Sequence, residues 1–258
     1  MLIKASSING FTIAATDGTI GTVSDLLFDD ASWTVRWLVV ETGNWLSNRQ
    51  VLLPAVALGH PDMTARSFPV RRTMAEVKSS PDVDTHLPVS RQYEVSSYNY
   101  YGLDPYWGTG EYMGGYGYWN GMLAMPPAPP TTPRRDEIDR MKRNADDPHL
   151  RSVAVLRGYH IHATDGEIGH LADFLIDDGD WSLRYLVIDT SNWWQGKEVL
   201  ISPKSTQDIR WTEQLIYLGV NRDRIRNSPD YDPFNPPSPA FDASMADHYS
   251  PRQPAKVD

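Results

Sequence analysis

The sequence predicts a mainly β protein made of two small antiparallel barrels in tandem, and three observations lead to this prediction. The segment from Gly10 to Gly21 returns without a gap as Gly158 to Gly169, an offset of 148 residues. Each copy alternates short Val-, Ile- and Trp-rich runs with Asp- and Gly-containing turns, a spacing typical of small sandwiches and barrels. Between the copies the chain becomes rich in Tyr, Gly and Trp and then in Pro, which is typical of a linker.

Turn residues place the strands of the first copy. Asp17-Gly18 is a strong hairpin signal, and Gly21 inside the returning strand predicts a bulge. The same residues return as Asp165, Gly166 and Gly169. We expect strands at 11–15, 20–28, 33–42, 50–53 and 66–71, a short helix within 73–79, and the same plan from 159 to about 227.

The repeat also sets the expected domain boundaries. It continues past the strands, because Tyr101 returns as Tyr249. We therefore expect a first barrel with an extended trailing segment at 1–101 and a Tyr/Gly/Trp- and Pro-rich linker at 102–149. A second barrel with its trailing segment follows at 150–250, and a tail at 251–258.

Composition narrows the function class. The 258 residues carry a formal net charge of −9, which disfavours a broad nucleic-acid footprint. The absence of cysteine excludes disulfides, thiol nucleophiles and cysteine-based metal clusters. No apolar run is long enough for a signal peptide or a membrane span. A cytoplasmic, soluble protein without a cofactor is expected.

The repeated block resembles the PRC-barrel family. The residues that carry the resemblance are the Asp-Gly-x-Ile-Gly turn, the Asp-Asp pair and the run Trp-x-x-Arg-x-Leu-Val that follows it, present in the first copy as Trp33 to Val39. The family includes the cytoplasmic domain of the photosynthetic reaction-centre H subunit, the C-terminal domain of the ribosome maturation factor RimM, and many stand-alone bacterial proteins. The resemblance implies the fold, and it implies no catalytic residue because the matching positions are turn, bulge and core residues.

Acidic turns are the richest carboxylate clusters. Asp177, Asp178 and Asp180 follow the second strand of the second copy, where Asp29-Asp30 stand in the first. Such turns attract Asp for backbone reasons, while converging carboxylates could also bind a cation or act as acid and base. We take solvated turns as the first interpretation and metal binding as the alternative.

Two histidines in the second copy are a weaker metal candidate. His160 and His162 alternate around Ile161 and so share one face of a strand. Simple hairpin pairing around Asp165-Gly166 places His170 on the other face. A role without metal is the first interpretation, because the first copy has Thr12 and Ala14 at these positions, and metal binding is the alternative.

Charged residues within the strands suggest ion pairs. Asp25 and Asp173 lie in otherwise apolar strands, and Arg36 and Arg184 lie in the strands that follow. Because a buried carboxylate needs a partner, we predict the pairs Asp25–Arg36 and Asp173–Arg184.

The expected function follows from the absence of known catalytic motifs in the sequence. No nucleophile elbow, phosphate loop or zinc-protease helix occurs, so we expect a non-catalytic interaction or assembly module with an unknown protein partner. Trp45 and Trp193, which follow predicted loops, are candidates for the partner surface, and the barrels could pack within one chain or as a homodimer. The alternatives are a role like that of the H subunit at a photosynthetic membrane complex, and a metal-binding protein or enzyme.

Overall fold

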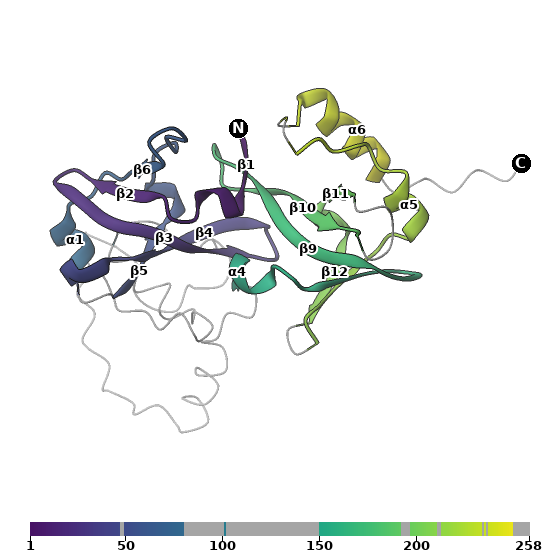
Figure 1. Ribbon diagram of the computed structural model, residues 1–258, viewed down its shortest axis with the longest axis horizontal. Helices are drawn as coiled ribbons and strands as arrows, with labels where there is room; N and C mark the ends of the chain where they lie inside the picture. Colours follow the sequence, from purple (N-terminus) through teal and green to yellow (C-terminus); the bar gives the residue numbers. More distant parts are fainter. Residues whose placement is uncertain are drawn as a thin grey trace, which may run out of the picture.

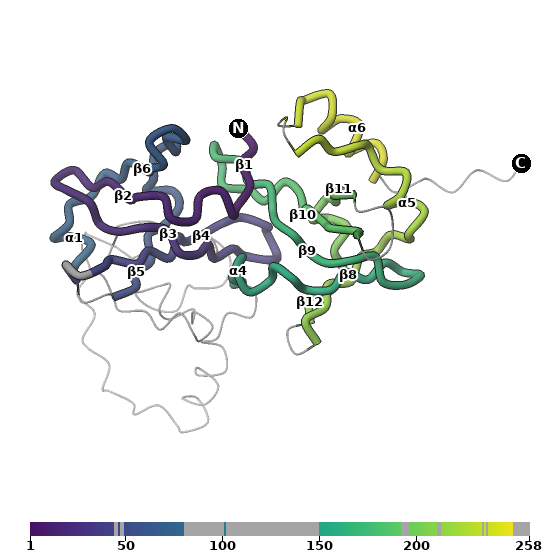
Figure 2. Tube along the Cα trace, viewed as in Figure 1, coloured from purple at the N-terminus to yellow at the C-terminus, as the bar shows by residue number. Residues whose placement is uncertain are grey.

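The structure consists of two β-sheets side by side, one from each repeat (Figure 1). The computed structural model describes residues 1–79, Tyr101 and 150–249, without 47–48, 192–196, 211–212, 234 and 236 and without the side chains of Asn44 and Trp45. The tube in Figure 2 shows the first repeat in purple and blue and the second in teal, green and yellow. The mainly β prediction is confirmed.

The first repeat forms a sheet with the order β5-β4-β3-β2-β6. Its elements are β1 (Leu2–Lys4), η1 (Ala5–Ile8), β2 (Thr12–Ala15), β3 (Gly18–Asp29), β4 (Thr34–Glu41), η2 (Gly43–Leu46), β5 (Gln50–Pro54), η3 (Ala55–Ala57), β6 (Ser67–Pro69) and α1 (Met74–Lys78). The predicted helix is α1, which begins after Thr73 because the Thr73 and Glu76 side chains form a capping box.

The second repeat forms a sheet with the order β11-β10-β9-β8-β13-β12. Its elements are β7 (Leu150–Ser152), α4 (Val153–Leu156), β8 (His160–Ala163), β9 (Gly166–Asp177), β10 (Leu183–Asp189), β11 (Glu198–Ile201), η4 (Pro203–Ser205), β12 (Thr206–Arg210), β13 (Leu215–Leu218), α5 (Arg222–Arg226) and α6 (Pro239–Tyr249). The prediction of purely antiparallel sheets is wrong at one pair in each repeat, because β2–β6 and β8–β13 are parallel.

The trailing segment of the second repeat differs from the extended chain that we expected. It ends in α6, an 11-residue helix that lies beside the second sheet (Figure 1). Phe241, Met245 and Tyr249 are four residues apart, so they share one helix face and contact a small cluster on the sheet. Tyr101, the counterpart of Tyr249, also returns to its sheet and donates a hydrogen bond from its hydroxyl to the Leu52 carbonyl at 3.0 Å.

The two repeats exchange their first strands. β1, at the start of the first repeat, pairs with β9 of the second, with Leu2 opposite Asp177. β7, at the start of the second repeat, pairs with β3 of the first, with Leu150 opposite Asp29. The offset of 148 relates these two registers residue for residue, so the exchange is reciprocal. We call residues 2–8 and 150–156 the exchanged segments.

The hydrophobic core follows from this exchange. One continuous cluster contains buried side chains of both repeats, including Ile3, Phe28, Leu156 and Phe174. The rings of Phe28 and Phe174, one from each repeat, lie 5.4 Å apart between centroids. The repeats therefore share a core, and each depends on the other for part of its apolar burial.

The glycines that mark the predicted bulge are required by a close approach of two strands. The register of β2 and β3 shifts next to Gly21, and that of β8 and β9 shifts next to Gly169, which confirms the bulge. A Cβ atom would lie 2.0 Å from the Glu41 carbonyl oxygen at Gly21, and 2.0 Å from the Asp189 carbonyl oxygen at Gly169. No larger residue fits either position without moving a neighbouring strand.

Candidate functional site

The hairpin aspartates do more than form turns. Asp17 Oδ1 accepts a hydrogen bond from the Met74 amide at 2.7 Å, and Asp165 Oδ1 accepts one from the Arg222 amide at 2.9 Å. Both amides begin a short helix, α1 or α5, so each turn aspartate binds an amide that the helix itself leaves unpaired. This explains why a side chain with an acceptor oxygen occurs at this position in both copies.

The predicted ion pairs of Asp25 and Asp173 are wrong. Asp25 accepts hydrogen bonds from the Ser152 hydroxyl and from the Ala154 amide at 3.0 Å, both in the second repeat. Asp173 accepts them from the amide of Ser6, at 3.2 Å, and from its hydroxyl, both in the first repeat. Each aspartate therefore binds the exchanged segment of the other repeat. Burial raises the pKa of Asp25, against three hydrogen bonds that lower it.

The arginines are displaced by bulges. On β4, Leu27 pairs with Trp37 and Phe28 with Val35, which leaves Arg36 as the extra residue of the strand. Arg184 has the same position on β10, between Leu183 and Tyr185. Simple alternation cannot place a bulged side chain, so the sequence could not predict that Arg184 would contact Asp177 and Asp180 instead.

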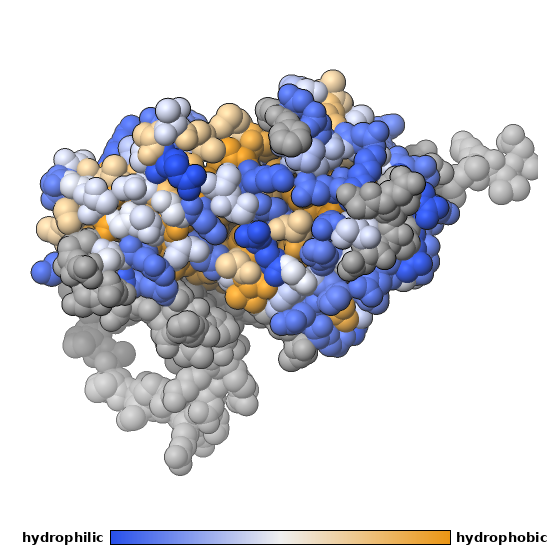
Figure 3. Space-filling model, viewed as in Figure 1, coloured by the Kyte–Doolittle hydropathy of each residue, from blue (hydrophilic) through white to orange (hydrophobic). Residues whose placement is uncertain are grey.

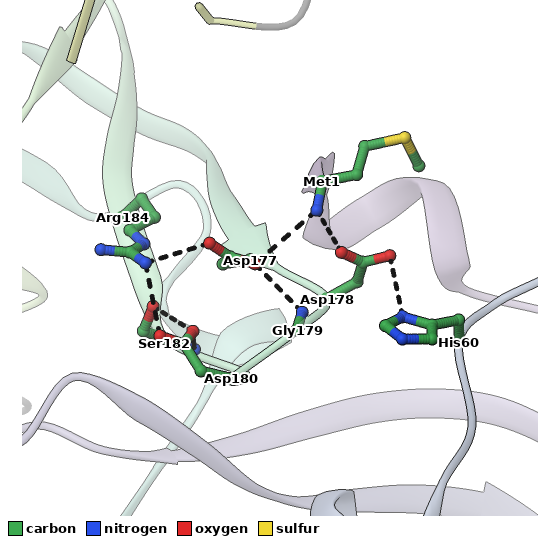
Figure 4. Close-up of polar contacts among 8 residues, drawn as sticks. All are labelled: Met1, His60, Asp177, Asp178, Gly179, Asp180, Ser182 and Arg184. Atoms are coloured by element: carbon green, nitrogen blue, oxygen red, sulfur yellow. Dashed lines mark hydrogen bonds and ion pairs between the residues drawn. The ribbon is translucent and has the colours of Figure 1, made fainter. Parts of the chain in front are cut away.

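The acidic turns also hold the exchanged segments. In the first repeat, Asp30 binds Arg151 of β7, with 2.6 Å between Nε and Oδ2. In the second repeat, its counterpart Asp178 binds the amine of Met1, the residue before β1 (Figure 4). His60 of the first repeat adds a contact to Asp178 at 3.5 Å. The paired Asp residues therefore join the repeats to one another.

The other carboxylates of the second turn are also satisfied within the chain (Figure 4). Arg184 Nη2 lies 3.0 Å from Asp177 Oδ2 and 3.3 Å from Asp180 Oδ2. Burial raises the pKa of Asp177, but the Gly179 amide and the Arg184 guanidinium outweigh it, so that pKa is lowered overall. Within the described residues, no group of three or more His, Asp or Glu side chains is arranged to hold a metal ion.

Two tryptophans lie in turns at the boundary between the repeats. Trp33 and Trp181 adopt φ values of 52° and 61°, a left-handed conformation that is unusual for bulky residues. The Trp33 carbonyl accepts a hydrogen bond from the Leu183 amide, and the Trp181 carbonyl accepts one from the Val35 amide, both at 2.8 Å. These contacts hold the strained turns in place and add another symmetric link between the repeats.

A cleft lies along this boundary. It is lined by the turn at Ala31–Trp33, by β10, by η4 and by α6, and its volume is about 760 Å³. Its charged lining residues are Arg184, the exposed Lys204 and Asp242, and Trp33 and Tyr185 give it aromatic surface. The Tyr185 hydroxyl donates a hydrogen bond to Asp242 of α6 at 2.6 Å, and burial together with that carboxylate raises its pKa. We call this feature the boundary cleft.

On the viewed face of the molecule, Figure 3 shows mostly hydrophilic residues, with hydrophobic patches near the middle.

The histidines lie apart from the boundary cleft. His160 binds Glu167, and the His162 ring lies 5.6 Å from the Tyr217 ring. The expectation that His170 lies on the other face is wrong, because His170 is directly opposite His160 in the register of β8 and β9. The bulge at Ile168 shifts the register by one residue, and a shift of one exchanges the faces of a strand.

The predicted partner residues fall outside the part of the chain that the structure describes. The side chain of Trp45 and all of Trp193 lie outside the described residues, as does the linker at 102–149. None of the described helices is long and apolar enough to cross a membrane.

Sequence reasoning missed the residues that join the repeats. β1 and β7 have three residues each, too few for a periodic pattern. The available signal was positional: Ile3 is apolar, Leu2 returns as Leu150, and both segments precede the first predicted strand of a repeat.

Comparison with known protein families supports membership of the PRC-barrel family. The model of the PRC-barrel domain matches residues 1–79, which are the exchanged segment and the sheet of the first repeat. Residues 1–79 are therefore a PRC-barrel domain, and the second repeat has a similar sequence and the same strand order with β12 added at its edge. No curated protein matches the chain.

Proposed function

We propose that this PRC-barrel protein is a non-catalytic assembly module in which two fused repeats act as one body that binds a protein partner. The reciprocal exchange of β1 and β7 carries this proposal. It gives the repeats a common core, so surfaces contributed by both are held in a constant relation to one another. A rigid, composite surface suits binding because little conformational entropy is lost when the partner docks.

The chemistry of the buried groups also favours binding over catalysis. Asp25 and Asp173 lie within otherwise apolar strands, and both accept hydrogen bonds from the exchanged segments. The carboxylates of the acidic turns pair with arginine side chains of the same chain. The carboxylates that contact the other repeat stabilise the assembly of the two repeats, which is a structural role and not a catalytic one.

The boundary cleft is the surface that we assign to the partner. It combines residues of both repeats, and aromatic and Arg side chains are enriched at the centres of protein interfaces. Lys204 lines it and is exposed, so it is a suitable position for a charge reversal that does not disturb the core.

Affinity capture with three full-length baits tests the proposal. The wild type and the control Lys78→Glu, an exposed lysine at the end of α1, are expected to recover the same partner, and Lys204→Glu is expected to lose it. Deletion of residues 102–119 in a fourth bait, which keeps the buried Tyr101, separates recruitment by the cleft from recruitment by the linker. No reproducible partner for the wild type, or equal capture by Lys204→Glu and Lys78→Glu, would argue against the assignment.

A further inference from the structure

A pair of histidines faces one another across two strands of the second repeat. In the register of β8 and β9, His160 is directly opposite His170. The His160 amide donates to the Gln214 carbonyl, on the side of β13, and the Leu171 amide donates to the Tyr159 carbonyl, both at 2.9 Å. This pattern makes His160 and His170 a non-hydrogen-bonded pair, the type with the closest side chains, with Cα atoms about 4.5 Å apart.

Both imidazoles project from the outer face of the sheet. The side chains of His160 and His170 are 56% and 35% exposed. Their strand neighbours Ile161 and Leu171 are fully buried, so alternation places the two rings together on the side that faces solvent. Two ring nitrogens are thus available to a dissolved ion.

Each imidazole also has a carboxylate beside it. His160 Nδ1 lies 2.7 Å from Glu167 Oε1, and His170 Nε2 lies 3.6 Å from Asp189 Oδ2. His160 Nε2 and His170 Nδ1 have no partner among the described residues. A histidine that binds metal through one nitrogen and contacts a carboxylate through the other is the usual arrangement at metal sites.

We infer that His160 and His170 form a surface site for a divalent transition-metal ion of the Zn²⁺, Ni²⁺ and Cu²⁺ class. Imidazole nitrogen suits these ions, and the chain contains no cysteine to compete for them. Two protein nitrogens supply the site, and water fills the remaining positions of the ion. The first repeat provides an internal contrast, because the corresponding facing pair there is Thr12 and Thr22.

Calorimetric titration of the untagged full chain with Zn²⁺, and separately with Ni²⁺, tests the site. We expect one saturable site in the wild type. His160→Ala and His170→Ala should each weaken it by more than the about 10- to 100-fold that loss of an outer partner costs. His162→Ala is the matched control, because His162 lies on the same strand but contacts Tyr217, and it should bind as the wild type does.

Three outcomes would overturn the inference: no saturable binding in the wild type, wild-type binding by His170→Ala, or equal losses in His162→Ala and His170→Ala. Circular dichroism of each variant checks that these exposed substitutions leave the fold intact.

A graft onto the first repeat tests whether the facing register creates the site. Thr12→His combined with Thr22→His places two histidines at the equivalent opposed positions. The number of bound Zn²⁺ ions per chain should rise from one to two. If it stays at one, the register alone does not create the site and the inference in this form is wrong.

Discussion

At the scale of single residues, the half-buried Asp25 and the buried Asp173 show how a carboxylate inside a strand can be explained without a catalytic role. Each lies in an apolar strand and accepts hydrogen bonds from the exchanged segment of the other repeat. Asp is suited to this task because one carboxylate can accept an amide and a hydroxyl together. Burial opposes the charge, and for Asp25 this effect prevails and raises the pKa.

The raised pKa of Asp25 predicts a pH dependence. A carboxyl whose pKa is higher in the folded state stabilises the fold most at low pH, and this contribution is lost as the pH rises through the folded-state pKa. The stability of the wild type relative to Asp25→Asn should therefore fall as the pH rises from the ordinary value of 3.8 upward. Urea unfolding of both proteins at several pH values measures this difference, and a difference that grows in favour of the wild type would contradict it.

Gly21 gives a steric prediction. Gly21→Ala would place a Cβ 2.0 Å from the Glu41 carbonyl oxygen, in a backbone conformation that alanine itself tolerates. Because β3 and β4 must separate to admit it, the substitution should cost about 1–3 kcal/mol of unfolding free energy or more. Gly179→Ala is the control: its Cβ would lie 3.3 Å from the Asp177 carboxylate, and it should change stability much less. Chemical denaturation of both variants compares them, and equal stabilities would refute the steric argument.

At the scale of elements, the short strands β1 and β7 join the two repeats, although each has only three residues. Three residues cannot form a stable strand alone, and both strands are stabilised by pairing with a sheet that belongs to the other repeat. A mutation in β1 or β7 should therefore destabilise the sheet of the other repeat.

Ile3→Ala tests this coupling. Ile3 lies on β1, is buried and faces Ile176 of β9, so its truncation should cost about 2–5 kcal/mol. Hydrogen exchange should accelerate mainly at Leu175–Asp177 in the second repeat. Ile13→Ala, on β2, is the control that should accelerate exchange in the first repeat. Faster exchange confined to the first repeat in Ile3→Ala would show that the strands are not exchanged.

The elements also show where sequence reasoning succeeds and where it fails. The Asp-Gly turns and the alternating runs predicted β2 to β5 closely, because hairpin pairing is local. The helix α6 was missed because its segment is surrounded by Pro and Asp residues and is only weakly amphipathic. The face of His170 was missed because a single bulge reverses the alternation.

At the scale of the whole molecule, the chain is a fused pair of strand-exchanged repeats. The shared core, the Asp25 and Asp173 contacts and the tryptophan turns all cross the same boundary. Fusion raises the effective concentration of one repeat near the other, but these contacts would remain if the covalent connection were cut.

Cleavage of the connection tests that statement. A protease site inserted between Pro130 and Thr131 allows the folded protein to be cut between the repeats. The two fragments should co-elute in size-exclusion chromatography at the size of the intact chain, and should separate only in denaturant. The uncut variant is the control. Fragments that separate under native conditions would show that the linker, and not the exchange, holds the repeats together.

The sequence by itself determined the mainly β class, the repeat and the hairpin turns, because these depend on residues close together in the chain. It also contained the residues that join the repeats, but their partners lie more than a hundred positions away. Only the tertiary structure decided which repeat each first strand joins, where the bulged arginines point and that His160 faces His170. Strand exchange and bulge registers depend on packing between distant segments, and local patterns do not encode that packing.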